Sequence, residues 1–371
     1  MSNEVLVFVK GWIDLIPPAL TLAHALRTLQ KDVVCVCSAC REQTRADLES
    51  AGIQVVEVCR GLADASSKLD KLRHYAAFRR GAWEAVDSAD EDALLWVFTI
   101  DTAMALGRRL LSRRYVQNLK ELHDRSPQRY RTAIRRYARH ARRVVVPEAS
   151  RAAILRCWYG LDRTPAVLPN RPLSHPRHRD LPIGDKNAAE ILRTVDEGQK
   201  IVLYQGSLAK DRDLTTIARG IHELGRQYRF VLMGRDLIGH LQQLRRLCPD
   251  LIHIPWVVPP THLEITSHAH VGIAAYAYDS LNSVFCAPNK IWEYTGFAIP
   301  MLCQDLPGLR FTIGASGAGV CTSMDGPRQV VDAVDRIEND YAGFSRRATE
   351  FYESIDNASV IAQVIADADS G

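Results

Sequence analysis

One stretch decides how the chain is read: CAPNKIWEYTGFAIPML at residues 286–302. Pro288 suits the first turn of a helix, and Gly296 suits a helix that ends before the next strand. Lys290 and Glu293 lie three residues apart, so their side chains share one face near the helix N-terminus. Free N–H groups and the helix dipole favour a diphosphate there, with the carboxylate available to hydroxyls. An ordinary surface ion pair fits this spacing equally well.

The same run, Pro-Asn-Lys-Ile-Trp-Glu-Tyr followed by Gly and then Pro, resembles the donor-site helix of GT-B glycosyltransferases, especially the retaining family 4 and its relatives. In that family the Glu at the position of Glu293 holds the ribose diol of a nucleotide sugar, and the resemblance implies the same here. It also implies donor contacts for Asn289 and Lys290. The family often has a second Glu eight residues earlier. This chain has Phe285 there, so contacts to the transferred sugar are less defined than contacts to the nucleotide.

The composition fits two globular domains. The chain has 371 residues, of which 47% are hydrophobic, and a net charge of +4. No basic region with a long apolar run opens the sequence, and no apolar run approaches the ~20 residues that span a bilayer. Nine cysteines stand at irregular spacings. We therefore expect free thiols in a reducing cytoplasm, and no signal peptide.

Strand and helix patterns alternate along most of the chain. Val5-Leu6-Val7-Phe8-Val9 is a continuous apolar run, typical of a strand buried on both faces of a parallel sheet. Residues 171–198 are rich in proline and charge and predict an interdomain linker. The predicted fold is α/β, with two Rossmann-like, doubly wound parallel-sheet domains facing across a cleft. The resemblance assigns residues 1–170 to the acceptor and 199–371 to the donor, with the last helix a candidate to pack back on the first domain.

Ligands of open α/β sheets bind beyond the carboxyl ends of the strands, so loops after strands hold the candidate residues. Gly206 and Ser207 begin a loop that resembles the family's glycine loop, in which a basic residue before the next helix binds the donor diphosphate. Alignment on Leu214 makes that residue Arg212, with Lys210 in reserve. A solvated charged turn is the alternative.

Other residues of the second domain are candidate donor contacts. Gly234 ends a strand, and Trp256 follows the next strand. The resemblance implies that these loops approach the nucleotide base, where Trp256 would pack unless it is a core or interdomain tryptophan. Tyr276 and Asn282 precede the donor helix, within reach of phosphate oxygens. No Asp-x-Asp motif stands between strands. We therefore expect no metal requirement, because Arg212 and the lysine of the donor helix would stabilise the leaving diphosphate.

Three positions of the first domain follow predicted strands. Gly11 lets the backbone approach the donor closely. Asp101 is a candidate for catalysis and acceptor recognition, with a helix N-cap as the alternative. The family commonly has a His-Asp pair where this chain has His123 and Asp124, after a predicted strand at 115–122. The resemblance therefore implies contacts to the sugar and the acceptor for this pair.

A basic segment suggests a second kind of partner. From Arg108 to Arg143 there are 13 Lys or Arg residues against two acids. Within it, Arg129–Arg143 predicts a helix with arginines on most of its surface and one apolar stripe: Tyr130, Ala133, Ile134, Tyr137, Ala138 and Ala141. Such a helix favours an anionic membrane leaflet carrying a lipid-linked acceptor over nucleic acid. A solvated helix packed on the sheet is the alternative.

Together these patterns predict a cytoplasmic glycosyltransferase of the hexosyl type, peripheral on the inner face of a membrane. It would use a nucleotide sugar, with UDP as the first choice and GDP open, and a saccharide or lipid-linked acceptor. The resemblance implies retention and a part in cell-surface polysaccharide or glycoconjugate synthesis. Two alternatives stay open: a UDP-sugar 2-epimerase on the same fold, and a nonenzymatic nucleotide-sugar-binding partner protein.

Overall fold

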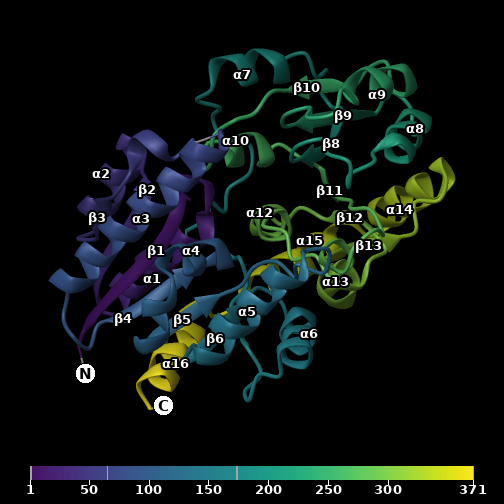
Figure 1. The fold of residues 1–371 in the computed structure, drawn as a ribbon. Helices are drawn as coiled ribbons and strands as arrows, with labels where there is room; N and C mark the ends of the chain where they lie inside the picture. The colour runs from purple at the N-terminus through teal and green to yellow at the C-terminus, as the bar shows by residue number, and fades with distance from the viewer. Residues whose placement is uncertain (1, 65, 173, 371) are drawn as a thin grey trace. The chain divides into compact units, whose positions relative to one another are not determined.

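The computed structural model describes residues 2–64, 66–172 and 174–370. They form two compact units. The first comprises the chain as far as Ser174 together with the segment that begins at Asp356, and the second runs from His175 to Ile355 (Figure 1). Each unit has its own parallel sheet, as the alternating sequence pattern predicts.

The sheet of the first unit has seven parallel strands in the order β3-β2-β1-β4-β5-β6-β7. The predicted apolar strand forms most of β1, which pairs with β2 and β4 and is buried on both faces. The strand bounds are β1 Glu4–Trp12, β2 Asp32–Ala39, β3 Gln54–Glu57, β4 Leu94–Phe98, β5 Tyr115–Asn118, β6 Arg143–Val146 and β7 Ala166–Val167.

Helices cover this sheet, and one of them comes from the far end of the chain. Helix α16 packs on α1, β6 and β7, and its Ile361, Val364 and Ile365 join the core of the first unit (Figure 1). The last helix therefore packs on the first unit. The helix bounds are α1 Pro17–Thr28, α2 Glu42–Ser50, α3 Lys68–Ser88, α4 Thr99–Leu106, α5 Gln128–His140, α6 Ala149–Tyr159 and α16 Asn357–Asp369, with short turns η1 Ile13–Leu15, η2 Arg60–Leu62 and η3 Arg108–Ser112.

The second unit is built on six parallel strands in the order β10-β9-β8-β11-β12-β13. Its strands are β8 Lys200–Gln205, β9 Tyr228–Met233, β10 Ile252–Ile254, β11 Val271–Ala274, β12 Met301–Gln304 and β13 Gly319–Thr322. Its helices are α7 Lys186–Leu192, α8 Thr215–Glu223, α9 Leu241–Leu247, α10 His262–Thr266, α11 Leu281–Val284, α12 Lys290–Gly296, α13 Pro307–Leu309, α14 Pro327–Asn339 and α15 Tyr341–Glu353, with the π-turn η4 Arg310–Gly314.

Successive residues of these strands serve opposite cores. Along β8, Leu203 faces the core that contains α12, whereas Val202 and Tyr204 face the core that contains α8 and α14. Such a strand is apolar at nearly every position because both faces are covered. The continuous apolar runs in the sequence therefore mark buried parallel strands correctly.

The strand order locates the ligand-binding edge of each sheet. In both sheets the order in which successive strands are added reverses beside the first strand. The switch lies between β1 and β4 in one unit and between β8 and β11 in the other. In open α/β sheets ligands bind outside the carboxyl ends of the strands at this switch point. The residues to inspect are therefore those that follow β1, β4, β8 and β11.

The predicted linker differs from the observed boundary. Within residues 175–198, helix α7 forms, and Leu181, Ile183 and Leu192 pack against the core of the second unit. The proline-rich composition signalled irregular backbone correctly. It did not signal that the apolar side chains among the prolines are partly buried against the core.

Candidate functional site

Tyr294 fixes helix α12 to the sheet of the second unit. Its hydroxyl donates to the Leu203 carbonyl at 2.8 Å and accepts from the backbone N–H of Gln205 at 3.2 Å. Its ring lies against Gly272 of β11, where a Cβ atom would come within 2.4 Å of the ring. A larger residue there would push the helix away, so Gly272 decides where α12 stands. The helix begins at Lys290 instead of at the predicted first-turn proline, which lies before the N-cap residue.

Two side chains from other elements hold the Glu293 carboxylate. Its Oε2 accepts a hydrogen bond from Nε2 of Gln205, and its Oε1 lies 3.3 Å from Nε2 of His262. Burial opposes ionisation of Glu293, but nearby basic side chains, His262 first, outweigh it, so the pKa of Glu293 lies below its usual value. Glu293 is therefore an anion at neutral pH, and each oxygen keeps a further acceptor position.

Helix α10 braces this carboxylate twice. His262 contacts it directly, and Thr266, one turn later, donates from Oγ1 to Oε1 of Gln205 at 2.7 Å. The Thr266 hydroxyl also lies 3.0 Å from the His262 carbonyl oxygen. We call these four residues the carboxylate ring: Gln205, His262, Thr266 and Glu293.

Lys290 begins α12 and is almost completely buried, with 7% of its surface exposed. Its Nζ atom lies 4.3 Å from the ring centroid of Tyr204 and 5.4 Å from that of Tyr276. It has no hydrogen-bond partner among the described residues. Burial, and then the charge of Arg212, lower the pKa of Lys290 to about 7. A buried cation without an acceptor is costly, so a bound anion would stabilise it.

Arg212 brings a second cation to the same tyrosine. Its guanidinium carbon lies 5.3 Å from the ring centroid of Tyr276, and its Nη1 donates to the backbone carbonyl of Ser207 at 3.3 Å. Its Nε atom is buried and finds no hydrogen-bond partner within the described residues. Lys210, the reserve candidate, is exposed. The structure therefore brings Arg212 and Lys290 together, as the sequence predicted.

Gly206 and Gly234 let the loops after β8 and β9 run against each other. Their φ angles are +140° and +150°, in the region that favours glycine. A Cβ atom at Gly234 would lie 2.2 Å from the Gly206 carbonyl oxygen. One at Gly206 would lie 3.3 Å from Nζ of Lys290. A side chain at Gly206 would therefore crowd the buried ammonium group of Lys290.

The other predicted donor residues stand in different surroundings. Trp256 is 37% exposed, with the guanidinium carbon of Arg235 5.3 Å from its ring centroid, so it is not a core tryptophan. Asn289 is the N-cap residue of α12, and its carbonyl accepts the N–H of Glu293 at 3.1 Å. Asn282 lies within α11 and is half-buried, and its contact with a donor stays a prediction.

In the first unit, the switch point holds a cluster around Asp101. Nζ of Lys10 lies 2.8 Å from Oδ2 of Asp101, and the Tyr75 hydroxyl donates to Oδ1. The same Nζ lies 4.2 Å from the Tyr75 ring centroid. Asp101 lies in the first turn of α4, whose N-cap residue is Phe98, so the N-cap alternative is wrong. Its side chain is 43% exposed and accessible to a ligand.

Two buried residues, Ser38 and His74, hold the backbone at Gly11 in place. Its N–H donates to Oγ of Ser38 at 2.9 Å, and that oxygen lies 2.7 Å from Nε2 of His74. Burial, and then the charge of Lys10, lower the pKa of His74, so the imidazole is neutral at pH 7. No atom lies within 4 Å of where a Cβ atom would stand at Gly11. The backbone there is open, as predicted.

His123 and Asp124 lie in a loop and not at a strand end. The predicted strand at 115–122 stops at Asn118, and His123 has a φ of +55°. Its ring meets Tyr130 edge-on at 5.1 Å between centroids, and burial lowers its pKa. Burial, and then the charge of Asp101, raise the pKa of Tyr130. Asp124 is half-buried in the turn that follows.

Sequence reasoning missed five residues of these two clusters, among them Thr266 of the carboxylate ring. Lys10 and Gln205 each stand directly before a strand-end glycine, Gly11 and Gly206. A polar residue closing an apolar strand before a glycine was a usable signal. The other three, Tyr75, His262 and Thr266, lie on helices that reach the site from elsewhere in the chain. No local pattern marks them.

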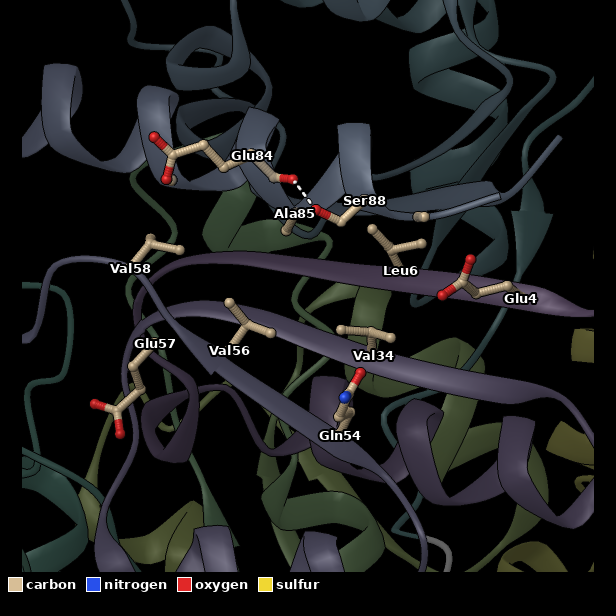
Figure 2. Close-up of a pocket in the computed structure, with 12 residues that line it drawn as sticks. Glu4, Leu6, Val34, Gln54, Val56, Glu57, Val58, Glu84, Ala85 and Ser88 are labelled. Atoms are coloured by element: carbon tan, nitrogen blue, oxygen red, sulfur yellow. Dashed lines mark hydrogen bonds between the residues drawn. The ribbon is translucent and has the colours of Figure 1, made fainter. Parts of the chain in front are cut away.

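One cavity in the first unit lies away from these residues. It measures about 480 Å³ between α3 and the strands β1 to β3, with Leu6, Val34 and Val56 among its lining residues (Figure 2). Gly81 lets α3 touch Val58, since a Cβ atom there would come within 2.6 Å of that side chain. Leu6 lies early in β1, toward the amino ends of the strands. The cavity therefore shares nothing with the predicted site residues.

The basic helix forms as α5, but it ends at His140, three residues before the predicted end, because Arg143 begins strand β6. Ile134, Tyr137 and Ala138 of α5 are buried, and the rest of the predicted stripe is half-buried. Four arginines outside the stripe are fully on the surface: Arg129, Arg135, Arg136 and Arg139. Arg131 is half-buried and donates to the Gln128 side chain at 2.9 Å. None of the helices in the described part of the chain is long and apolar enough to cross a membrane.

The nine cysteines are free thiols, as expected. Cys35 and Cys37 are buried in β2, where burial raises the pKa of Cys35 to about 12. Over residues 2–64, 66–172 and 174–370, no group of three His, Cys, Asp or Glu side chains is arranged to hold a metal ion.

Solved structures share this fold across nearly the whole chain. Anabaena HepE in complex with UDP-glucose matches with a TM-score of 0.72 and 13% identity over 99% of this chain and 100% of that chain. Sucrose-phosphate synthase from Thermosynechococcus elongatus matches with 0.69 and 13% over 98% and 97%. WaaG, a glycosyltransferase involved in lipopolysaccharide biosynthesis, matches with 0.63 and 13% over 99% and 100%. These similarities confirm the predicted GT-B fold class. No protein-family model and no curated protein sequence matches the chain.

Proposed function

We propose that the chain is a glycosyltransferase that takes a sugar from a nucleoside diphosphate sugar, with UDP as the nucleotide. One observation carries the proposal: the buried cation Lys290 lacks an acceptor beside Arg212, and stands on the same short helix as the ionised Glu293. Two cations suit a diphosphate, and a carboxylate with open acceptor positions suits a ribose diol. HepE, similar in fold, was solved with UDP-glucose, which supports the choice of nucleotide.

The chemistry follows from where charge develops. The bond between the sugar C1 and the diphosphate oxygen breaks, and a bond forms between C1 and an acceptor hydroxyl oxygen. The hydroxyl proton passes to an oxygen of the leaving diphosphate. Arg212 and Lys290 stabilise the negative charge that grows there, so turnover needs no divalent metal. Retention, with attack from the face of the leaving group, is what the family resemblance implies, and we include it in the proposal.

Lys290 has to move for this role. Its Nζ atom is buried against the rings of Tyr204 and Tyr276. A lysine side chain has four rotatable bonds, so its ammonium group can swing toward an arriving phosphate. Because the pKa of Lys290 is about 7, the anion also draws a proton onto the amine.

The first unit supplies the acceptor side of the proposal. Asp101, Lys10 and Tyr75 offer an accessible carboxylate in a fixed orientation, which suits an acceptor hydroxyl. The exposed arginines of α5 suit an anionic leaflet that presents a lipid-linked saccharide. We accordingly propose action at a membrane surface, in the synthesis of polysaccharide or glycoconjugate.

Calorimetry and product analysis test the proposal. The wild type should bind UDP, and Glu293→Ala should weaken that binding about 10-fold or more, because a charged hydrogen-bond acceptor is lost. With UDP-sugar, UDP should accumulate only when a saccharide acceptor is present, and mass spectrometry should show the glycosylated acceptor. UDP release without any acceptor would favour the epimerase. Tight UDP binding without turnover on any acceptor would favour a nonenzymatic binding protein.

A further inference from the structure

His262 is the least expected member of the carboxylate ring. It stands at the start of α10, which follows the loop after β10, and its side chain is 15% exposed. Nε2 points at Oε1 of Glu293 from 3.3 Å. Since an ionised carboxylate can only accept, Nε2 carries the proton in this contact. Nδ1 is buried and has no hydrogen-bond partner among the described residues. The imidazole of His262 is therefore not held in place by a second hydrogen bond.

The carboxylate ring leaves Glu293 with a defined number of free hydrogen-bond acceptor positions. A carboxylate has about four acceptor positions, two on each oxygen. Gln205 occupies one on Oε2, and His262 occupies one on Oε1. One position therefore stays open on each oxygen. A pair of neighbouring hydroxyls on one sugar ring matches that pattern, whereas a single hydroxyl leaves one position unused.

The ring also restrains rotation of the carboxylate. Gln205 is oriented by Thr266, and Thr266 and His262 belong to the same helix, so both oxygens of Glu293 are tied to α10. Without His262, Oε1 would lose the side chain that lies against it, and the carboxylate could turn about the Gln205 contact. Preorganised acceptors bind more tightly because less side-chain freedom is lost on binding.

We infer that His262 is a positioning residue that sets the preference of this site for a ribonucleotide, by fixing Glu293 as a two-point acceptor for the vicinal ribose hydroxyls. This inference rests on the proposed nucleotide-sugar site and adds to it a residue and a selectivity. His262 itself does not touch the reacting atoms. Its loss should therefore raise KM for the UDP-sugar and leave kcat nearly unchanged.

The test compares UDP with 2′,3′-dideoxy-UDP by calorimetry. The wild type should bind UDP about 10-fold or more tightly than the dideoxy analogue, because two hydroxyls meet a charged acceptor. His262→Ala should lose most of that preference by weakening UDP binding, while its affinity for the dideoxy analogue stays within about twofold of wild type. His262→Gln, whose amide can donate to the same oxygen, should recover part of the preference.

A nearby histidine provides the matched control. His268 is half-buried in the same unit, and its Nε2 contacts the Leu181 carbonyl oxygen at 2.8 Å without touching Glu293. His268→Ala should leave the preference for UDP over the dideoxy analogue intact, whatever its effect on stability. If His262→Ala does not fold, His262→Asn replaces it, since its shorter amide does not reach the carboxylate.

The outcomes distinguish a failure of the proposed nucleotide site from a failure of the role of His262. A wild type that binds neither ligand overturns the proposed nucleotide site and this inference with it. A wild type that binds both equally overturns only the two-point acceptor. A wild type that prefers UDP, with His262→Ala keeping the full preference, removes His262 from the role and leaves the proposed function standing.

Discussion

The Nζ atom of Lys290 lies 4.3 Å from the centre of the Tyr204 ring, where no described residue offers it a hydrogen bond. The face of an aromatic ring attracts a cation, but more weakly than a charged acceptor does. The amine is thus kept inside the protein with an incomplete set of partners. That state accounts for the lowered pKa of Lys290 and for the first two predictions.

Replacing Lys290 should separate activity from stability. Lys290→Met keeps the length of the side chain and removes the charge, so turnover should fall about 10²-fold or more as the diphosphate loses a stabilising cation. The thermal unfolding midpoint should stay the same or rise, because a buried unpaired ammonium group is removed. Lys210→Met, at an exposed position of the neighbouring loop, is the control and should change neither quantity. A variant that loses stability while keeping activity would contradict the assignment.

UDP affinity should decrease as the pH rises above about 7. The pKa of Lys290 is about 7 in the free protein, and a bound diphosphate raises it, so binding takes up a proton between the two values. Affinity should then fall by up to about tenfold per pH unit in that window, and Lys290→Met should abolish this slope. Calorimetry in buffers of different ionisation enthalpy measures the proton uptake directly.

The same pKa fixes the sign of a stability effect. The unfolded chain holds the Lys290 proton up to about pH 10.4, whereas the folded chain releases it from about pH 7. Between these values the unfolded state binds more protons, so this residue makes the free energy of unfolding increase with pH. Wild type and Lys290→Met should accordingly approach each other in stability as the pH rises. Parallel curves would contradict the shifted pKa.

Arg212→Ala should lower turnover about 10²-fold with the fold intact, since this guanidinium group is the second cation for the leaving diphosphate. Arg219→Ala, on the exposed face of α8, is the control. Wild-type turnover should survive EDTA. A strict need for Mg²⁺ or Mn²⁺ would show that the two cations do not suffice.

The cluster in the first unit should act on the acceptor alone. Tyr75→Phe removes the hydroxyl that donates to Asp101 and keeps the ring that contacts Lys10. KM for the acceptor should rise about 10-fold, because the carboxylate is no longer held in place, and UDP affinity should not change. Asp87→Asn, which breaks an exposed ion pair in the same unit, should leave both unchanged. Equal effects on acceptor and UDP would remove the cluster from the acceptor side.

Binding to anionic vesicles should depend on α5. Each arginine near an anionic surface contributes about 1 kcal/mol, so changing four of them to Gln should strongly weaken vesicle binding at low salt. The structure selects the four exposed arginines of α5: Arg129, Arg135, Arg136 and Arg139. Changing Arg226, Arg245 and Arg246 of the second unit is the control. A wild type that ignores anionic vesicles at low salt, yet glycosylates a soluble acceptor, would make α5 a solvated helix only.

Local sequence patterns predicted those features of the fold that neighbouring residues along the chain determine. The apolar run at Val5–Val9 marked a buried strand, and the stripe of α5 marked its inward face. The predicted linker extends past the unit boundary at His175, because the packing of partly buried Ile183 depends on a core formed by residues far along the chain. Local composition does not contain that information.

The candidate site shows the same division. Lys290, Glu293 and Arg212 could be found because they belong to a motif or to a loop between a strand and a helix. His262 could not, since its role comes from a contact with a residue 31 positions later and its own surroundings are ordinary. Contacts between distant residues of common types leave no local signal.

The position of α16 has a consequence for how the protein is made. The helix belongs to the core of the first unit, yet the ribosome delivers it after the whole second unit. Domains generally fold in the order of their synthesis, but here the core of the earlier unit lacks Ile361, Val364 and Ile365 until the second unit has been synthesised. The later unit can therefore complete its fold first, and a nascent chain arrested near residue 355 would expose the apolar surface of the first unit that α16 covers.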